Sequence, residues 1–121
     1  MRSLLLVAHG SRRELSNEEV RRVSQQIEKL AGENFLSINC AFLELAIPSI
    51  PEGIDQCINE GATSVIVFPY FLSAGRHVSE DIPQIIREKQ QEYPSIEIKI
   101  VEHVGAVTGM ADLILQHIST T

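Results

Sequence analysis

Four short apolar segments alternate with four longer segments of helical periodicity, and this alternation is the strongest constraint on the fold. The apolar segments are residues 3–8, 37–42, 63–68 and 96–100. The first and third are apolar at consecutive positions, which is typical of strands buried on both faces in the middle of a parallel sheet. The second and fourth alternate apolar with polar residues, which indicates strands nearer the edges of the sheet.

A strand followed by a helix, repeated four times, favours the α/β class with right-handed crossovers. We therefore predict one domain over residues 1–121, built on a four-stranded parallel sheet in the order 2-1-3-4 with helices on both faces. A chain of this length can bury roughly two thirds of the surface that its unfolded form exposes.

Three serines mark the predicted helix starts. Ser16 with Glu19, and Ser49 with Glu52, have the spacing of a capping box, and Ser79 precedes two acidic residues that suit the positive end of a helix dipole. The apolar helix positions expected to be buried are Val20, Val23, Ile27, Leu30, Ile50, Ile54, Cys57, Ile58, Ile82, Ile85, Ile86, Met110, Leu113, Ile114 and Ile118.

Composition excludes several classes of partner. The net charge of −6 argues against a nucleic-acid surface, which needs a basic face. No segment reaches the length of a membrane span, and the apolar run 4–8 is too short for a signal-peptide core, so we expect a cytoplasmic protein with no membrane partner. Cys40 and Cys57 fall on apolar faces and are expected to be buried free thiols.

Polar side chains follow the ends of three predicted strands. His9, Gly10, Ser11, Arg12 and Arg13 come directly after the first strand. The segment 69–77, which ends in Gly75-Arg76-His77, follows the third strand, and Glu44 follows the second. In an open α/β sheet with this strand order, ligands bind beyond the carboxyl ends of strands one and three. We therefore expect these groups to share one rim.

Two imidazoles and one carboxylate suit a divalent first-row metal ion such as iron, cobalt or nickel. Three protein ligands leave coordination positions open for a substrate, whereas a structural zinc site is closed by four ligands. Gly10 and Gly75 would let a bulky planar molecule approach the backbone, and nearby arginines could bind its carboxylates. Taken singly, His9 and Glu44 are equally compatible with ordinary solvated loop residues.

Three segments together resemble a known family. VAHGSRR, AFLELAIPSI and FPYFLSAGRHVSEDIP are similar to the small class II chelatases of the sirohydrochlorin chelatase group, and the resemblance extends from about residue 4 to residue 104. It implies a flavodoxin-like half-domain that inserts cobalt or iron into sirohydrochlorin in cobalamin or siroheme biosynthesis. Short members of the family pair as homodimers, so the resemblance also implies a homodimer.

The resemblance assigns roles to positions of this chain. It implies that His9, Glu44 and His77 bind the metal ion and assist removal of the pyrrole protons. It implies no cofactor beyond the substrate metal ion, Co²⁺ or Fe²⁺ and possibly Ni²⁺, with cellular availability deciding among metals. The residues expected to contact sirohydrochlorin are Gly10, Ser11, Arg12, Ser73, Gly75 and Arg76.

Two other functions are compatible with parts of the pattern. A carrier that binds a metal ion or a tetrapyrrole without catalysis could use the same fold. A histidine phosphatase also places a histidine and a glycine after the first strand, but Ala8 occupies the position of its arginine. The roles of Arg13 and His103 stay open, with a structural or dimer-contact role as the default for His103.

Overall fold

The computed structural model describes residues 1–119 and 121, and it contains the predicted parallel sheet. The strands pair in the order β2-β1-β3-β4, all parallel, which confirms the predicted topology. The strands are β1 (Arg2–Ala8), β2 (Ser37–Phe42), β3 (Ser64–Pro69) and β4 (Glu97–Ile100). The helices are α1 (Glu14–Ala31), α2 (Ile50–Asn59), α3 (Ile82–Glu92) and α4 (Met110–Ser119).

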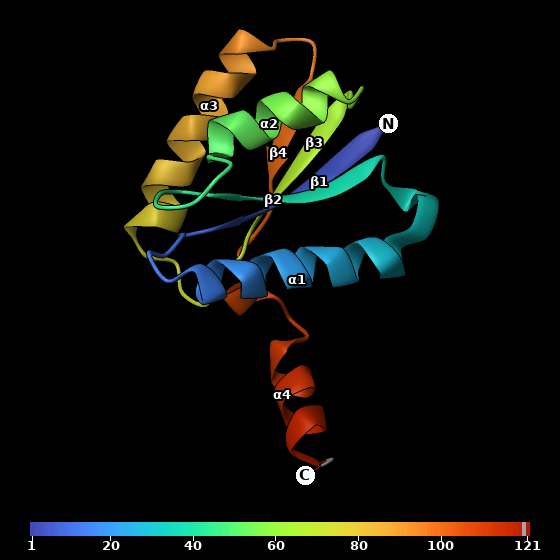
Figure 1. Ribbon diagram of the computed structural model, residues 1–121, viewed down its shortest axis with the longest axis vertical. Helices are drawn as coiled ribbons and strands as arrows, with labels where there is room; N and C mark the ends of the chain where they lie inside the picture. Colours follow the sequence, from blue (N-terminus) through green and yellow to red (C-terminus); the bar gives the residue numbers. More distant parts are fainter. Residues whose placement is uncertain (120) are drawn as a thin grey trace.

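Helices cover both faces of the sheet, as predicted. α2 and α3 lie on one side and α1 lies on the other (Figure 1). The core on the α2–α3 side is formed by alternate residues of the strands, because successive side chains of a strand point to opposite faces. These strand residues, and the helix residues that face them, are fully or nearly fully buried. The strand residues are Leu5, Val7, Val65, Val67 and Ile98, and the helix residues are Ile50, Ile54, Cys57, Ile82 and Ile86.

The predicted start is correct for α2 and wrong for α1. Ser49 accepts a hydrogen bond from the Glu52 amide, and the Glu52 carboxylate accepts one from the Ser49 amide, which is the predicted capping box. α1 begins at Glu14, before Ser16, and the side chain of its N-cap residue, Arg13, makes no capping bond. The buried Asn17 explains the difference, because its amide bonds the backbone just before the helix and fixes an earlier start.

The helical segment around Ser79 begins before this residue, whereas α3 itself begins after it, at Ile82. A five-residue π-helix, η2 (His77–Asp81), leads directly into α3, and the Ile82 amide donates to the carbonyl oxygen of His77. Ser79 does not cap the helix because its hydroxyl donates to the carbonyl oxygen of Gly75. Pro83 lies in the first turn of α3, where a missing amide hydrogen is tolerated.

The apolar side chains of α4 are exposed, which contradicts the expected burial. α4 projects away from the sheet (Figure 1), and its main contact is with η3 (Val104–Ala106). Leu30, at the end of α1, is also exposed. Helical periodicity identifies side chains that share a face, but it does not identify what covers that face. The α4 residues that were expected to be buried but are at least half exposed are Leu113, Ile114 and Ile118.

Both cysteines are free, as predicted. Cys57 is fully buried among apolar residues, and burial raises the pKa of its thiol to about 11. Cys40 is only partly buried, which corrects the expected full burial of this residue. Burial also raises the pKa of the Cys40 thiol. No helix in the described part of the chain is both long enough and apolar enough to cross a membrane.

Candidate metal-binding site

The loops that follow β1 and β2 are joined by backbone hydrogen bonds beyond the ends of the strands. The Leu43 amide donates to the carbonyl oxygen of Ala8 at 2.9 Å, and the Glu44 amide donates to that of His9 at 3.0 Å. On the other side of β1, the Tyr70 amide donates to the carbonyl oxygen of Val7 at 2.7 Å. The parallel register therefore continues into the loops and brings Glu44 beside His9, at the rim expected from the strand order.

Gly10 makes this approach of the two loops possible. Its φ of +93° lies in the left-handed region that favours glycine, and a Cβ atom there would lie 1.8 Å from the carbonyl oxygen of Glu44. The structure thus gives Gly10 a role inside the protein, in addition to the predicted clearance for a planar ligand. Gly75 is different, because a Cβ atom at this position would meet no atom within 4 Å.

His9 and His77 lie side by side at the rim. Their ring centroids are 4.8 Å apart and the ring planes are tilted by 51°. Nε2 of His9 is 3.3 Å from Oε1 of Glu44, and the His9 side chain is 45% exposed. The three predicted ligands, which come from the loops after β1, β2 and β3, therefore gather in a solvent-accessible position.

Each histidine presents its Nδ1 atom to an oxygen atom of the protein. Nδ1 of His9 is 3.0 Å from the carbonyl oxygen of Gly10, and Nδ1 of His77 is 2.8 Å from Oδ2 of Asp81. A carbonyl oxygen and an ionised carboxylate only accept hydrogen bonds, so each Nδ1 atom must carry the hydrogen. In a neutral imidazole this leaves the lone pair on Nε2, the atom that can bind a metal ion.

A bound cation would stabilise the contact between His9 and Glu44. Both ring nitrogens of His9 face oxygen atoms that only accept, so a neutral ring would direct a lone pair at the Glu44 carboxylate. A metal ion bound between Nε2 and the carboxylate removes this conflict.

The three groups do not form a closed site. Within the part of the chain that the structure describes, no three histidine, cysteine, aspartate or glutamate side chains are already arranged to hold a metal ion together. His9 contacts both Glu44 and His77, but the trio is open to solvent. An open arrangement of this kind binds a metal ion less tightly than a structural zinc site with four closed ligands.

The predicted substrate-binding residues lie around this rim with different local partners. Arg12 is exposed, and Arg76, 80% exposed, forms an ion pair with Glu80 at 3.4 Å. The Ser11 hydroxyl accepts a hydrogen bond from the Arg13 amide, so it also has a structural use. Ser73 and Gly75 are exposed in the loop after β3. His103 precedes η3, and its carbonyl oxygen accepts from the Ala106 amide.

The buried Asn17 holds the loop after β1 and was not predicted from the sequence. Its Oδ1 accepts from the Ser11 amide at 2.9 Å, and its Nδ2 donates to the carbonyl oxygen of Ser11 at 2.8 Å. Nδ2 also donates to Glu14. An amide side chain on the inward face of an amphipathic helix is the signal that could have identified this residue.

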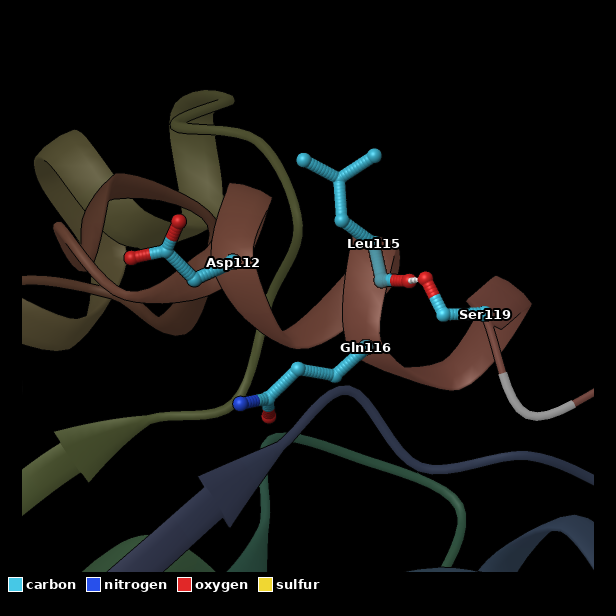
Figure 2. Close-up of a pocket in the computed structure, with 4 residues that line it drawn as sticks. All are labelled: Asp112, Leu115, Gln116 and Ser119. Atoms are coloured by element: carbon cyan, nitrogen blue, oxygen red, sulfur yellow. Dashed lines mark hydrogen bonds between the residues drawn. The ribbon is translucent and has the colours of Figure 1, made fainter.

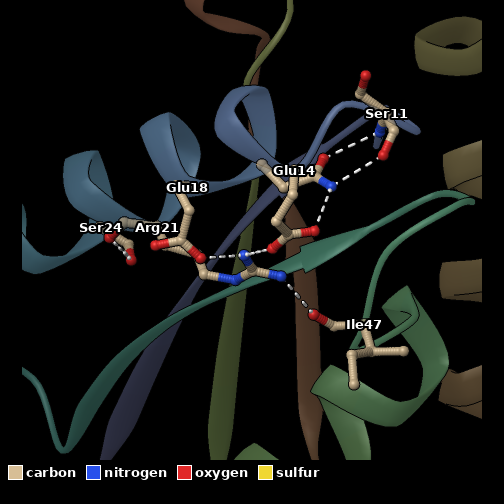
Figure 3. A network of polar contacts seen from close by, with 7 residues as sticks. Ser11, Glu14, Glu18, Arg21, Ser24 and Ile47 are labelled. Atoms are coloured by element: carbon tan, nitrogen blue, oxygen red, sulfur yellow. Dashed lines mark hydrogen bonds and ion pairs between the residues drawn. The ribbon is translucent and has the colours of Figure 1, made fainter.

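Arg21 ties α1 to the loop after β2. Its guanidinium group donates to Glu14, Glu18 and the carbonyl oxygen of Ile47 (Figure 3). It also stacks over the ring of Phe42, 5.2 Å from the centroid. The guanidinium lowers the pKa of the Glu14 carboxyl. Arg21 thus fixes the loop that carries Glu44.

The hollows along α4 contain none of the predicted ligands. One, of about 730 Å³, is lined by Asp112, Leu115, Gln116 and Ser119 (Figure 2). A second, of about 350 Å³, lies at the base of α4 and has a largely apolar lining of Tyr70, Leu72, Val104, Met110 and Leu113. The candidate metal site lies elsewhere, at a surface rim where the side chains of His9, Glu44 and His77 are 45%, 55% and 45% exposed.

Comparison with known proteins agrees with this fold. A model of the CbiX family matches residues 3–121. The sirohydrochlorin ferrochelatase of Priestia megaterium is 30% identical over 121 residues, which are 100% of this chain and 45% of the relative. The sirohydrochlorin cobaltochelatase of Methanococcus aeolicus is 38% identical over 86 residues, 71% of this chain and 59% of the relative.

A solved structure shares the architecture. The sirohydrochlorin chelatase SirB from Bacillus subtilis subspecies spizizenii, in complex with cobalt, superposes with a TM-score of 0.83 at 27% identity. The match covers 98% of this chain and 50% of the SirB chain. The chain thus spans about half the length of the relatives that it matches.

Proposed function

The chain belongs to the CbiX family, and we propose on this basis that it inserts a divalent metal ion, cobalt or iron, into sirohydrochlorin. The observation that carries the proposal is the meeting of His9, Glu44 and His77 at one rim of the sheet. Both histidines present Nδ1 to an acceptor, which leaves Nε2 as the metal-binding atom.

In the proposed reaction the metal ion is a substrate, and the protein groups hold it only until it is transferred. His9, Glu44 and His77 bind the hydrated ion, and its remaining positions stay open for the ring nitrogens of sirohydrochlorin. Those nitrogens replace the bound water molecules as two pyrrole protons leave. Glu44 or either imidazole can accept these protons, because all three groups lie at the same rim.

The open geometry of the site favours transfer of the metal ion to a substrate over storage of the ion. A site that must release its ion gains nothing from a closed set of four ligands, and no such set is preassembled among the described residues. Arg12 and Arg76 extend from the loops next to the histidines and are well exposed. We assign them to the carboxylates of sirohydrochlorin, which a guanidinium can bind through two parallel hydrogen bonds.

A homodimer is part of the proposal. α4 supplies an apolar surface for the contact, because Leu113, Ile114, Leu115 and Ile118 are each at least half exposed. A ten-residue helix is marginal in water on its own, so packing against a partner would stabilise it.

The function is tested by mixing the protein with sirohydrochlorin and either Co²⁺ or Fe²⁺ without oxygen, and following the absorption change of the macrocycle. We expect faster insertion than in the protein-free mixture, and a large loss of rate for His77→Ala. Arg87→Ala, on the exposed side of α3, is the control and should match the parent rate. A His77→Ala variant as fast as the parent would contradict the site assignment.

The same assay separates the alternatives. Tight binding of sirohydrochlorin without faster metal insertion would indicate a carrier. Hydrolysis of a phosphomonoester without added metal would indicate a phosphatase. Comparing the rates with Co²⁺ and Fe²⁺ decides between a cobaltochelatase and a ferrochelatase. We further propose a cytoplasmic location, which the two free thiols support because that compartment keeps cysteines reduced.

A further inference from the structure

Asp81 contacts a predicted metal ligand but is not itself one of the predicted ligands. Its Oδ2 atom is 2.8 Å from Nδ1 of His77, and both side chains belong to η2 (His77–Asp81). The two side chains are similarly exposed, His77 at 45% and Asp81 at 44%. Positions four residues apart lie on the same side of a helical turn, so the backbone itself brings the pair together.

We propose that Asp81 is a positioning residue that holds His77 in the tautomer whose Nε2 atom binds the metal ion. The inference rests on the proposed function for the identity of the ligand. It does not require that Asp81 touch the metal ion or sirohydrochlorin.

The chemistry of the contact determines the tautomer. An ionised carboxylate accepts hydrogen bonds and has none to donate, so Nδ1 of His77 carries the hydrogen. The lone pair then resides on Nε2. Among the hydrogen bonds of the described residues no other acceptor holds Nδ1, so removal of Asp81 frees the hydrogen to move to Nε2, where it would block metal binding. Hydrogen-bonding partners of this kind also orient the ring and make the imidazole a stronger donor to the metal.

The two histidines are held by different acceptors. Nδ1 of His9 faces the carbonyl oxygen of Gly10, which belongs to the main chain and cannot be removed by a side-chain substitution. Nδ1 of His77 depends on the side chain of Asp81 alone among the recorded hydrogen bonds of the described residues. A single substitution can therefore release His77 and leave His9 held.

Glu80 provides a matched control in the same turn. Its carboxylate is next in sequence to that of Asp81, but it pairs with Arg76 at 3.4 Å. Glu80→Gln therefore removes one negative charge from η2 without removing the acceptor of His77. Asp81→Asn keeps an oxygen that can accept from Nδ1, and Asp81→Ala removes the acceptor altogether.

The first experiment measures the tautomer of His77 in the metal-free protein. Long-range ¹H–¹⁵N correlation spectra of the imidazole rings, recorded at pH 8.5 where an ordinary imidazole is neutral, distinguish hydrogen on Nδ1 from hydrogen on Nε2. We expect the Nδ1–H pattern for His77 in the parent, in Glu80→Gln and in Asp81→Asn. We expect the Nε2–H pattern to appear in Asp81→Ala, with His9 unchanged.

The second experiment measures the affinity for Co²⁺ by calorimetric titration of the same four proteins. Loss of such a hydrogen-bonding partner typically weakens metal binding by about 10- to 100-fold, so we expect that increase in Kd for Asp81→Ala. We expect a smaller increase in Kd for Asp81→Asn, and we expect the Kd of Glu80→Gln to stay within about twofold of that of the parent. Equal unfolding midpoints for the four proteins exclude a loss of fold.

An unchanged His77 tautomer in Asp81→Ala, or an unchanged Kd for Co²⁺ in that variant, would overturn the assignment. Equal weakening by Glu80→Gln and Asp81→Ala would also overturn it, because the effect would then come from charge alone. Neither readout uses sirohydrochlorin. A failure of the chelatase assay with the expected tautomer change would therefore count against the proposed function and not against the role of Asp81.

Discussion

Nε2 of His9 lies 3.3 Å from Oε1 of Glu44, although these residues come from loops after different strands. The backbone hydrogen bond from the Glu44 amide to the carbonyl oxygen of His9 fixes the two loops in this position. The backbone pairing of the two loops therefore sets the proximity of this imidazole and this carboxylate.

Replacing Glu44 by glutamine should weaken metal binding and slow insertion. The amide keeps the shape of the side chain but cannot neutralise a divalent cation, and it cannot accept a pyrrole proton. Where a general base is lost, rates typically fall by about 100-fold or more. The rate of insertion and the Kd for Co²⁺ check this. Glu88→Gln, on the exposed side of α3, is the control, and a Glu44→Gln variant with parental values of both quantities would remove Glu44 from the site.

Replacing Gly10 by alanine should both destabilise the protein and displace Glu44. The new Cβ atom would lie 1.8 Å from the Glu44 carbonyl oxygen, on a residue whose φ is +93°. Gly32→Ala is the control, because φ is also positive there but a Cβ atom meets nothing within 4 Å. We expect Gly32→Ala to lower the free energy of unfolding by about 1–2 kcal/mol. Gly10→Ala should lower it further in urea denaturation, and equal losses would contradict the steric argument.

Removing Asp55 should destabilise the fold by leaving a buried cation with fewer partners. Nζ of Lys89 is 2.6 Å from Oδ1 of Asp55, and Lys89 is only 8% exposed. Asp55→Ala should lower the free energy of unfolding by about 1.5–3 kcal/mol, because a hydrogen bond to a charged group contributes that much. Lys89→Met removes the cation and should lower the free energy of unfolding less than Asp55→Ala does, because an apolar side chain is tolerated in place of a buried ion pair. Denaturation of both variants checks the order.

Cys57 should resist alkylation in the native protein. Burial raises the pKa of its thiol to about 11, so about one molecule in a thousand carries the reactive thiolate at pH 8. Cys40 is partly exposed and should react first with iodoacetamide. Because the folded state favours the protonated thiol, Cys57 contributes stability that is lost as the pH rises toward 11. Mass spectrometry of the modified protein, with and without denaturant, measures the order of reaction.

The surface of α4 should determine the oligomeric state. Leu113→Glu combined with Ile118→Glu places two charges on apolar positions that are 60% and 61% exposed. We expect the parent to be a dimer and this variant a monomer, as measured by light scattering after size exclusion. Gln116→Glu adds charge at a position that is already polar and should leave the dimer intact. A parent that is monomeric at all concentrations would contradict the proposed homodimer.

Most of the fold could be predicted because it follows from local periodicity. Two strands apolar on both faces and two strands of alternating polarity determine which strands are central, and parallel pairing then fixes the order. The gathering of His9, Glu44 and His77 follows from the same order, since the ends of neighbouring parallel strands meet at one edge.

What the sequence could not predict depends on contacts between segments. The burial of Asn17 and the role of Gly10 depend on which backbone atoms approach them, and no local pattern contains that information. The failed capping prediction at Ser16 has the same cause, because Asn17 bonds the preceding loop and moves the start of the helix. The exposure of α4 is the clearest example, because its apolar residues have the spacing typical of a buried helix and yet are exposed.

In the proposed dimer, the exposed face of α4 links the stability of the protein to the amount of chain present. Dissociation on dilution removes the packing that stabilises α4, so the stability of the protein depends on its concentration. While single chains predominate, the number of dimers rises with the square of the number of chains. A modest increase in synthesis would then produce a larger increase in the amount of dimer.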